Sequence, residues 1–530
     1  MNDADLLLSQ LRDRKISRRT FIGRMAALSA MGLLPLQMTS SALAATPVKG
    51  GHMRFAMGHG STTDSLDPGK IVNGFLSSAH YAITNTLTEV DAHGVLVPKL
   101  AESWDASADA AEWSFKLRKG IEFHDGKSLN VKDIVASMNH HRGDQSTSSA
   151  KTIADPITEI VIDGDRIKFV LSSGDADFPF KLSIYNFTIY QANSDGSLNW
   201  NNHVGVGGYV LKDFEPGVRA TFERNPNYWQ EDRAHFDSAE LLVVSDPIAR
   251  QTALTTGAVD AIDRVDLKTA SLLKRVPGIV LENVTSKTHY TFPMNTTVGP
   301  LNDRNVRMAL KLAFDREEML NKILHGYGSI GNDQPISSAY PYFNAELKQR
   351  AYDPEQAKFY LKKAGLTKLD IELSAADAAF PGSVDAAVLF GERAKKAGIS
   401  IKVKREPNDG YWSNVWMKKP FVACYWTGYP TVDSIFTAAY AAGGSWNDTY
   451  WDHAKFNNLL TTARSELDTS RRGQMYGEMQ QILSDEGGVI VPFFANDVFA
   501  TSDKVGHGDL SSNYEIDGRM FFERWWFKEA

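Results

Sequence analysis

Cysteine is almost missing from this sequence. Cys424 is the single cysteine among 530 residues, so no disulfide can form within the chain. Cysteine usage therefore does not indicate the compartment in which the protein works.

The signatures of common enzymes are missing as well. The sequence contains no G-x-S-x-G, H-E-x-x-H, P-loop or C-x-x-C motif. The run Gly205-Val206-Gly207-Gly208 lacks the third glycine of a dinucleotide fingerprint. His140 and His141 are adjacent, and adjacent side chains on a helix point about 100° apart, which makes a poor metal pair. We therefore expect neither catalysis nor a cofactor; an enzyme would need a Ser/His/Asp set that meets in a cleft.

An excess of positive charge is also absent. The formal net charge is −7, and the N-terminus holds the only basic block, so nucleic-acid binding is not expected. The composition is that of an ordinary folded protein without long disordered segments. A chain of 530 residues is too long for one compact core, and two or three domains are expected.

The N-terminal segment carries three export signals in order. Ser17-Arg18-Arg19-Thr20-Phe21 resembles the twin-arginine signal, and the apolar stretch 25–36 that follows is too short to span a bilayer. Ala42-Leu43-Ala44 then fits a signal peptidase site. We predict that residues 1–44 are a signal peptide cleaved near Ala44, and that the protein is periplasmic after passing the twin-arginine translocase. Removing this segment leaves the mature chain at −10, and no cysteine near the cleavage site could carry a lipid anchor.

Short-range patterns predict a mixed α/β chain. Trp113, Phe115 and Leu117 alternate with polar residues, which is typical of a half-buried strand. Asn130 precedes apolar residues at helical spacing and is a candidate N-cap. Residues 157–171 form a candidate hairpin around Asp163-Gly164.

The second half of the chain alternates strands and helices, which predicts βαβ units. The expected strands are residues 369–373, 399–403, 421–425 and 489–494, and the expected helices are residues 384–397 and 471–486. Nearer the N-terminus, residues 50–57 are expected to form a strand and residues 75–90 a helix. The aromatic residues of the C-terminal segment 519–527 are expected to pack against the core.

A series of motifs along nearly all of the mature chain resembles the family 5 extracellular solute-binding proteins, the oligopeptide, dipeptide and nickel binding components of ABC importers. The motifs that carry the resemblance are LAESWDAS from Leu100, EWSFKLRKGIEFHDGKSLNVKDI from Glu112, Gly207-Gly208-Tyr209, ERNPNYW from Glu223, TGAVD from Thr256, Leu301-Asn302-Asp303 through Asp315-Arg316, and Asp353-Pro354-Glu355-Gln356-Ala357 through Gly365. Each motif also has a local structural interpretation, and the order and spacing of the whole series make the resemblance specific.

The resemblance implies an α/β architecture like that of type II periplasmic binding proteins, with two lobes joined by a double hinge. The first lobe would comprise residues 45–86, 203–287 and 496–530, with an extra inserted subdomain at 87–202. The second lobe would span 288–495, and the chain would cross between lobes near Ser286–Asn295 and near Pro492–Asp497. Such a receptor works as a monomer, closes on its ligand and serves the transmembrane permease subunits of an importer.

The stretch Phe421–Tyr440 is the main candidate for ligand binding. A strand ends at the turn Thr427-Gly428-Tyr429-Pro430, and Asp433 follows as a candidate N-cap of a helix. Trp426, Tyr429 and Asp433 therefore share one loop, where two rings and a carboxylate suit an apolar or cationic ligand. The alternative is a loop that packs against the core.

Charged groups that clamp peptides in the family are missing at the matching positions. Trp426 matches a tryptophan of the peptide binders, but Tyr429 stands where their aspartate binds the ligand ammonium. Ala423 replaces an arginine of the oligopeptide binder, and Leu369–Pro381 lacks the arginine of the dipeptide binder. We therefore expect a modified peptide, an amine or another peptide-like compound. Further candidate wall residues are Tyr411, Trp412, Trp446 and Tyr290, each with core packing as its alternative, and Asp377 is a second candidate acid.

A nickel or metal-chelate receptor of the same family is the second hypothesis. It requires histidines that face the cleft, and His59, His289 and His453 are the candidates. Metal analysis of the purified protein distinguishes the two hypotheses.

Overall fold

The computed structural model describes residues 47–408, 410–444 and 446–529, so the predicted signal peptide lies outside the described residues. Among the helices within these ranges, none combines the length and the apolar character that crossing a membrane requires.

The largest sheet has seven strands in the order β12-β19-β11-β1-β10-β9-β8, and we call the part built on it the first lobe. Its strands are β1 (His52–Met57), β8 (Tyr209–Glu215), β9 (Arg219–Arg224), β10 (Ser238–Val243), β11 (Ala261–Ile262), β12 (Ile279–Val284) and β19 (Asp497–Ser502). β1 runs parallel to both β10 and β11, whereas β12 and β11 pair antiparallel with β19. One sheet thus unites strands from both ends of the described chain, because apolar strands far apart in sequence bury their faces together.

Helices and two small sheets complete this lobe. They are the helices η2 (Pro68–Lys70), α3 (Gly74–Ile83), α7 (Pro247–Thr255), α8 (Ala270–Leu273), α17 (Glu515–Gly518) and α18 (Phe521–Arg524), and the strand pairs β2 (Thr88–Val90) with β3 (Leu96–Pro98) and β20 (Val505–Gly506) with β21 (Trp526–Phe527). The aromatic C-terminal segment packs on β1: Phe521 stacks on Phe55 at 4.3 Å between ring centroids, and Trp525 is fully buried. The predicted docking of this segment is confirmed.

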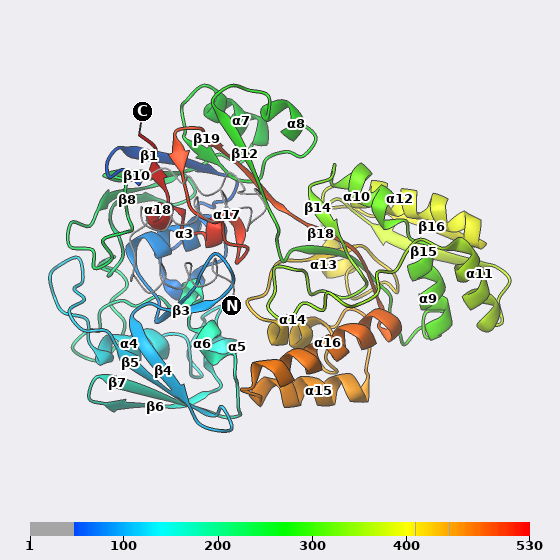
Figure 1. The fold of residues 1–530 in the computed structure, drawn as a ribbon, viewed down its shortest axis with the longest axis horizontal. Helices are drawn as coiled ribbons and strands as arrows, with labels where there is room; N and C mark the ends of the chain where they lie inside the picture. The colour runs from blue at the N-terminus through cyan, green and yellow to red at the C-terminus, as the bar shows by residue number, and fades with distance from the viewer. Residues whose placement is uncertain (1–46, 409, 445, 530) are drawn as a thin grey trace, which may run out of the picture. The chain divides into compact units, whose positions relative to one another are not determined.

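A separate four-stranded antiparallel sheet, in the order β4-β5-β7-β6, interrupts the first lobe in sequence (Figure 1). Its elements are β4 (Ala101–Ala106), β5 (Glu112–Leu117), α4 (Val131–Asn139), α5 (Lys151–Ala154), β6 (Ile157–Asp163), β7 (Arg166–Leu171), α6 (Phe178–Lys181) and η3 (Tyr185–Phe187). Asn130 caps α4 through a reciprocal bond with Asp133, and β6 and β7 form the predicted hairpin. These two local predictions are confirmed, and so is the half-buried strand with Trp113, Phe115 and Leu117, which is β5.

The rest of the chain forms what we call the second lobe. Its strands are β13 (His289–Pro293), β14 (Gly328–Ile330), β17 (Cys424–Trp426) and β18 (Val489–Ala495) in one sheet, and β15 (Leu369–Ala375) and β16 (Ile399–Arg405) in another. Its helices are α9 (Arg304–Leu312), α10 (Arg316–Ile323), α11 (Pro354–Lys363), α12 (Ser383–Ala394), η4 (Lys395–Ala397), α13 (Tyr411–Asn414), α14 (Val432–Ala439), α15 (Ala454–Ser465) and α16 (Thr469–Glu486). β15 and β16 pair in parallel with α12 between them, which confirms the predicted βαβ unit.

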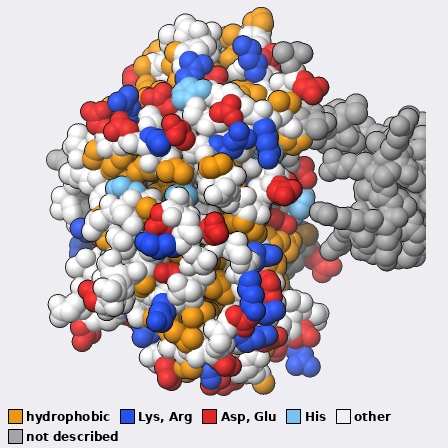
Figure 2. Space-filling model, turned by 90° about the vertical axis from the view of Figure 1, so that its left-hand side faces the viewer, with side chains coloured by type: hydrophobic (Ala, Val, Ile, Leu, Met, Phe, Trp, Pro, Cys, Tyr) orange, Lys and Arg blue, Asp and Glu red, His pale blue; other side chains and the backbone are white. Residues whose placement is uncertain are grey.

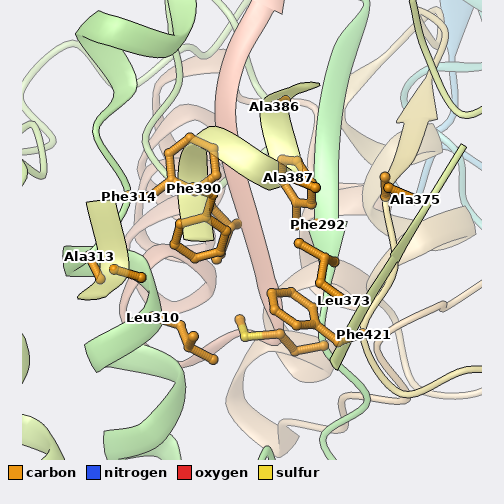
Figure 3. Close-up of a cluster of buried hydrophobic side chains, with 14 of the residues drawn as sticks. Phe292, Leu310, Ala313, Phe314, Leu373, Ala375, Ala386, Ala387, Phe390 and Phe421 are labelled. Atoms are coloured by element: carbon orange, nitrogen blue, oxygen red, sulfur yellow. The ribbon is translucent and has the colours of Figure 1, made fainter. Parts of the chain in front are cut away.

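Aromatic side chains fill the core of the second lobe. Phe314 and Phe390 lie 4.5 Å apart between ring centroids, and Phe292 of β13 lies 5.5 Å from Phe314 (Figure 3). Phe421 completes the group at 6.5 Å from Phe390. This dense packing gives the strand before the candidate loop a rigid support.

Two connections link the lobes. Residues 285–288 join β12 to β13, and Asn496 alone separates β18 from β19. The connections lie side by side, because Asn496 donates from its side chain to Asn283 at 2.8 Å and Ala495 donates from its backbone to Thr288 (Figure 1). The domain boundaries given above stay predictions.

Two predicted elements differ in extent. The predicted helix 75–90 ends at Ile83, whose carbonyl accepts a hydrogen bond from Gly207, and residues 88–90 form β2. The predicted strand 421–425 is shifted, since β17 spans Cys424–Trp426 and Phe421 forms only an isolated bridge with Met294. Contacts with segments far away in sequence decide both boundaries, and these contacts cannot be inferred from the local sequence pattern.

Candidate ligand-binding site

The candidate loop presents a cluster of aromatic rings. Trp426, the last residue of β17, lies 6.2 Å from Tyr429 and 6.3 Å from both Trp416 and Trp446, measured between ring centroids. Its ring is buried, and its indole Nε1 has no hydrogen-bond partner among the described residues. A buried donor without a partner is uncommon in folded proteins, so this indole is a candidate donor to a ligand.

Tyr429 is held in the turn that follows. Its backbone amide donates to the Tyr340 hydroxyl at 3.1 Å, and its half-buried side chain leaves part of the ring accessible. Burial raises the pKa of its hydroxyl to about 12, so Tyr429 is neutral at physiological pH. It can stack on a ligand or donate one hydrogen bond.

Two of the predicted wall residues are exposed. Trp446 is 50% exposed beside Trp426, and Trp412 is 40% exposed with its ring centroid 5.5 Å from Tyr425. Both rings therefore have a face available to another molecule. Their neighbours hold them in place, so a ligand would not need to order them.

The other two predicted wall tyrosines lie deeper. Tyr290 of β13 stacks on Phe380 at 4.2 Å between ring centroids, and burial raises its pKa to about 12. Tyr411 is fully buried and donates from its hydroxyl to Ala423 at 2.7 Å. The prediction that Tyr411 lines a site is wrong in this structure, because its polar end is used to hold β17 in place.

Asp433 does not have its predicted position or role. Thr431 caps α14 by accepting from Ser434, and Asp433 lies inside the first turn. Its buried carboxylate accepts from Arg464 Nε at 3.0 Å, and burial raises its pKa despite that neighbour. The carboxylate is therefore already paired within the protein and is not available as the charge that faces a ligand.

Lys287 is a charged residue that the sequence analysis did not single out. It lies in the connection 285–288 and packs against Gly428, where an added Cβ would come within 2.7 Å of the Cβ of Lys287. Its ammonium reaches the Pro430 carbonyl in the turn. The sequence offered one signal for this residue: Lys287 is a lysine within a predicted crossing between the lobes. Its position beside the candidate loop is visible only in the fold.

The acid Asp377 and the three candidate histidines each have a different local environment. Asp377 is exposed and accepts from the Gly382 amide at 3.2 Å. His59 lies beside Arg264, and burial together with that guanidinium lowers its pKa to about 4. His289 is fully buried in β13, and His453 caps α15 by accepting from Phe456. No group of three or more potential metal ligands occurs in the described ranges.

The second lobe also contacts the inserted subdomain, the part that carries the four-stranded sheet β4-β5-β7-β6, through a buried ion pair. Arg472 of α16 lies 2.6 Å from Asp177, and both side chains are buried. Nearby, the Ala176 amide donates to the Arg464 carbonyl at 2.7 Å. The two lobes thus meet at a second place besides the hinge.

Surface charge shows no strong preference for one sign on the face drawn in Figure 2. Acidic and basic side chains are interspersed there, with apolar side chains between them. This face therefore carries no patch dominated by one sign of charge.

Comparison with known proteins identifies the fold and the family. The family model described as bacterial extracellular solute-binding proteins, family 5 middle, matches residues 95–448. Di/tripeptide-binding protein 2 of Pseudomonas aeruginosa is 26% identical over 471 residues, covering 80% of this chain and 86% of that protein. The nickel-binding periplasmic protein of Escherichia coli is 25% identical over 303 residues, covering 54% of this chain and 57% of that protein.

A solved structure resembles most of the chain. A periplasmic murein tripeptide-binding protein in its unliganded open form superposes with a TM-score of 0.79 at 18% identity, covering 92% of this chain and 99% of that one. The likeness confirms the predicted α/β fold of the type II periplasmic binding proteins, with two lobes.

Proposed function

Because the chain belongs to the bacterial extracellular solute-binding proteins of family 5, we propose that it is the periplasmic substrate-binding component of an ABC import system. It binds a small peptide-like solute between its lobes and delivers it, as a monomer, to the transmembrane permease subunits. The relative that binds di- and tripeptides supports this ligand class. The hypothesis of a metal receptor has less support, since the described residues contain no group of three or more potential metal ligands.

The aromatic loop at the end of β17 carries the proposal. Trp426 has a buried indole donor without a partner among the described residues, and exposed Trp446 lies beside it. We assign ligand contact to Trp426, Tyr429 and Trp446, with Trp412 and Tyr290 as further wall residues. Tyr411 and Asp433 support the loop from behind, through Ala423 and Arg464.

Mass spectrometry of compounds retained after native purification tests the ligand class directly. We expect a peptide-like compound, and calorimetry with that compound should show at least ~10-fold weaker binding for Trp426→Ala, because stacking and one hydrogen bond are lost together. The control is Phe359→Ala, an exposed ring on α11. Wild-type affinity in a folded Trp426→Ala protein would place recognition elsewhere.

Export is proposed to use the twin-arginine translocase, with cleavage near Ala44. The support is the sequence Ser17-Arg18-Arg19-Thr20-Phe21, followed by an apolar segment and an A-x-A site. Replacing Arg18 and Arg19 with lysine should strongly reduce the protein in the periplasmic fraction, measured by immunoblot. Undiminished periplasmic protein would contradict this route.

A further inference from the structure

Lys287 occupies a position where both lobes meet. Its ammonium donates to the Pro430 carbonyl of the second lobe at 3.2 Å and to the Asn513 side chain of the first lobe at 3.3 Å. The ammonium also lies 4.7 Å from the centre of the Tyr340 ring. Both hydrogen bonds are long and go to neutral acceptors, and an ammonium has three donors.

The charge of Lys287 is not balanced by a nearby acid. The side chain is only 4% exposed, and no carboxylate of the described residues lies within salt-bridge distance of it. Burial alone lowers its pKa to about 8, without any opposing contribution from a charged neighbour. Burying an unpaired ammonium is costly, so a protein seldom keeps one without a partner.

Other buried cations in this protein show the usual arrangement. Lys99 is as buried as Lys287 and lies 2.8 Å from both Glu89 and Glu523. Lys311 lacks a direct ion pair, but it donates to carbonyls in the last turn of α16, where the helix dipole is negative. Lys287 has neither an acid nor a helix end, which makes it the exception among these three.

The surroundings of Lys287 are those of the candidate site. Gly428 and Pro430 of the aromatic turn contact it, and the predicted negative charge of that loop, Asp433, is neutralised by Arg464. The indole Nε1 of Trp426, at the start of that turn, is a donor without an acceptor among the described residues. The loop and Lys287 together therefore offer a free donor and a positive charge.

We propose that Lys287 binds an anionic group of the ligand, a carboxylate or a phosphate, at the hinge between the lobes. The inference rests on the proposed function and specifies its ligand as an acidic peptide-like compound, whereas the sequence left a modified peptide, an amine or another peptide-like compound open. The anion takes the third donor of the ammonium and supplies the missing counter-charge. Since Lys287 lies in a connection between lobes and touches both of them, binding there favours their closed arrangement.

Matched peptides test the proposal on the whole mature protein. Calorimetry compares trialanine, trialanine amide and Ala-Glu-Ala amide, which carry a terminal carboxylate, no carboxylate and a side-chain carboxylate, with inorganic phosphate as a fourth probe. We expect at least ~10-fold tighter binding of an acidic probe than of trialanine amide. The acidic probe that binds most tightly identifies the source of the anion.

Two substitutions separate charge from shape. Lys287→Met removes the charge at similar length and should abolish the preference for the acidic probe, whereas Lys287→Arg should keep it. Equal binding of acidic and amidated probes by the wild type, or an undiminished preference in Lys287→Met, would overturn the proposal and leave the proposed function standing. Binding of none of the probes would overturn the peptide-like ligand class and this inference together.

Thermal unfolding without added peptide excludes a merely structural role. Because the buried ammonium has no acidic partner, Lys287→Met should unfold at the same temperature as the wild type or higher. A clearly lower unfolding temperature would show that Lys287 holds the hinge together, and would count against a ligand role.

Discussion

At the scale of single residues, burial decides which polar groups are available to a ligand. Tyr411 and Asp433 have the residue types of a binding site, but their polar atoms are used by Ala423 and Arg464. Trp426 Nε1 is buried without a hydrogen-bond partner among the described residues, and the buried Lys287 ammonium makes only long hydrogen bonds to neutral acceptors. Under the proposed function, Trp426 and Lys287 are therefore stronger candidates for ligand contact than Tyr411 and Asp433.

Asp448 gives a prediction about pH at this scale. It accepts from Trp416 Nε1 at 3.0 Å under the candidate site, and burial raises its pKa to about 7. A carboxyl whose pKa is higher in the folded than in the unfolded chain binds more protons when folded, so its contribution to stability is lost as the pH rises from about 4 to about 7. Asp448→Asn should remove this loss and stabilise the protein at pH 8 by on the order of 1–4 kcal/mol.

Denaturant unfolding of both proteins at pH 5 and pH 8 measures the effect. Asp497, whose pKa burial also raises to about 7, titrates in both proteins, so the difference between them isolates Asp448. A difference that is the same at both pH values would contradict the assignment.

At the scale of elements, the register of β17 explains how the aromatic cluster is presented. Trp426 pairs with His289 and Cys424 with Thr291 of β13. Because side chains alternate along a strand, Cys424 and Trp426 are buried on one face, while Tyr425 between them is exposed on the other. The strand then ends at a turn whose glycine allows close contact with Lys287. Strand register and turn together place rings and ammonium at one edge of the sheet.

At the scale of the whole molecule, the lobes are joined by two short connections and by a separate contact. The connections are residues 285–288 and Asn496, and the buried pair Arg472–Asp177 links α16 to the inserted subdomain. A hinge lets the lobes move, whereas this pair opposes their separation. Removing one partner of a buried pair typically costs about 3–5 kcal/mol.

Arg472→Gln is therefore expected to shift the mature protein toward more open conformations. Small-angle X-ray scattering should show a larger radius of gyration than that of the wild type. The matched control is Glu355→Gln, which removes an exposed ion pair with Lys358 on α11. An unchanged radius of gyration in a folded Arg472→Gln protein would mean that this pair does not hold the lobes together.

The sequence by itself determined the features that depend on neighbouring residues. The cap of α4, the hairpin β6–β7, the β15–α12–β16 unit and the family motifs follow from local patterns, because capping and alternation act over a few residues. It also placed the aromatic loop after a buried strand. These predictions held because the physics involved is short-range.

Only the tertiary structure decided the charge at the site. Arg464, which neutralises Asp433, is 31 residues away in sequence, and Pro430, which Lys287 contacts, is 143 residues away. The energy of a charge depends on the water it loses and on the partners it gains, and both are set by segments that meet only in the fold. The sequence therefore suggested a site for an apolar or cationic ligand, whereas the contacts of Lys287 and Asp433 in the fold support the anion proposed above.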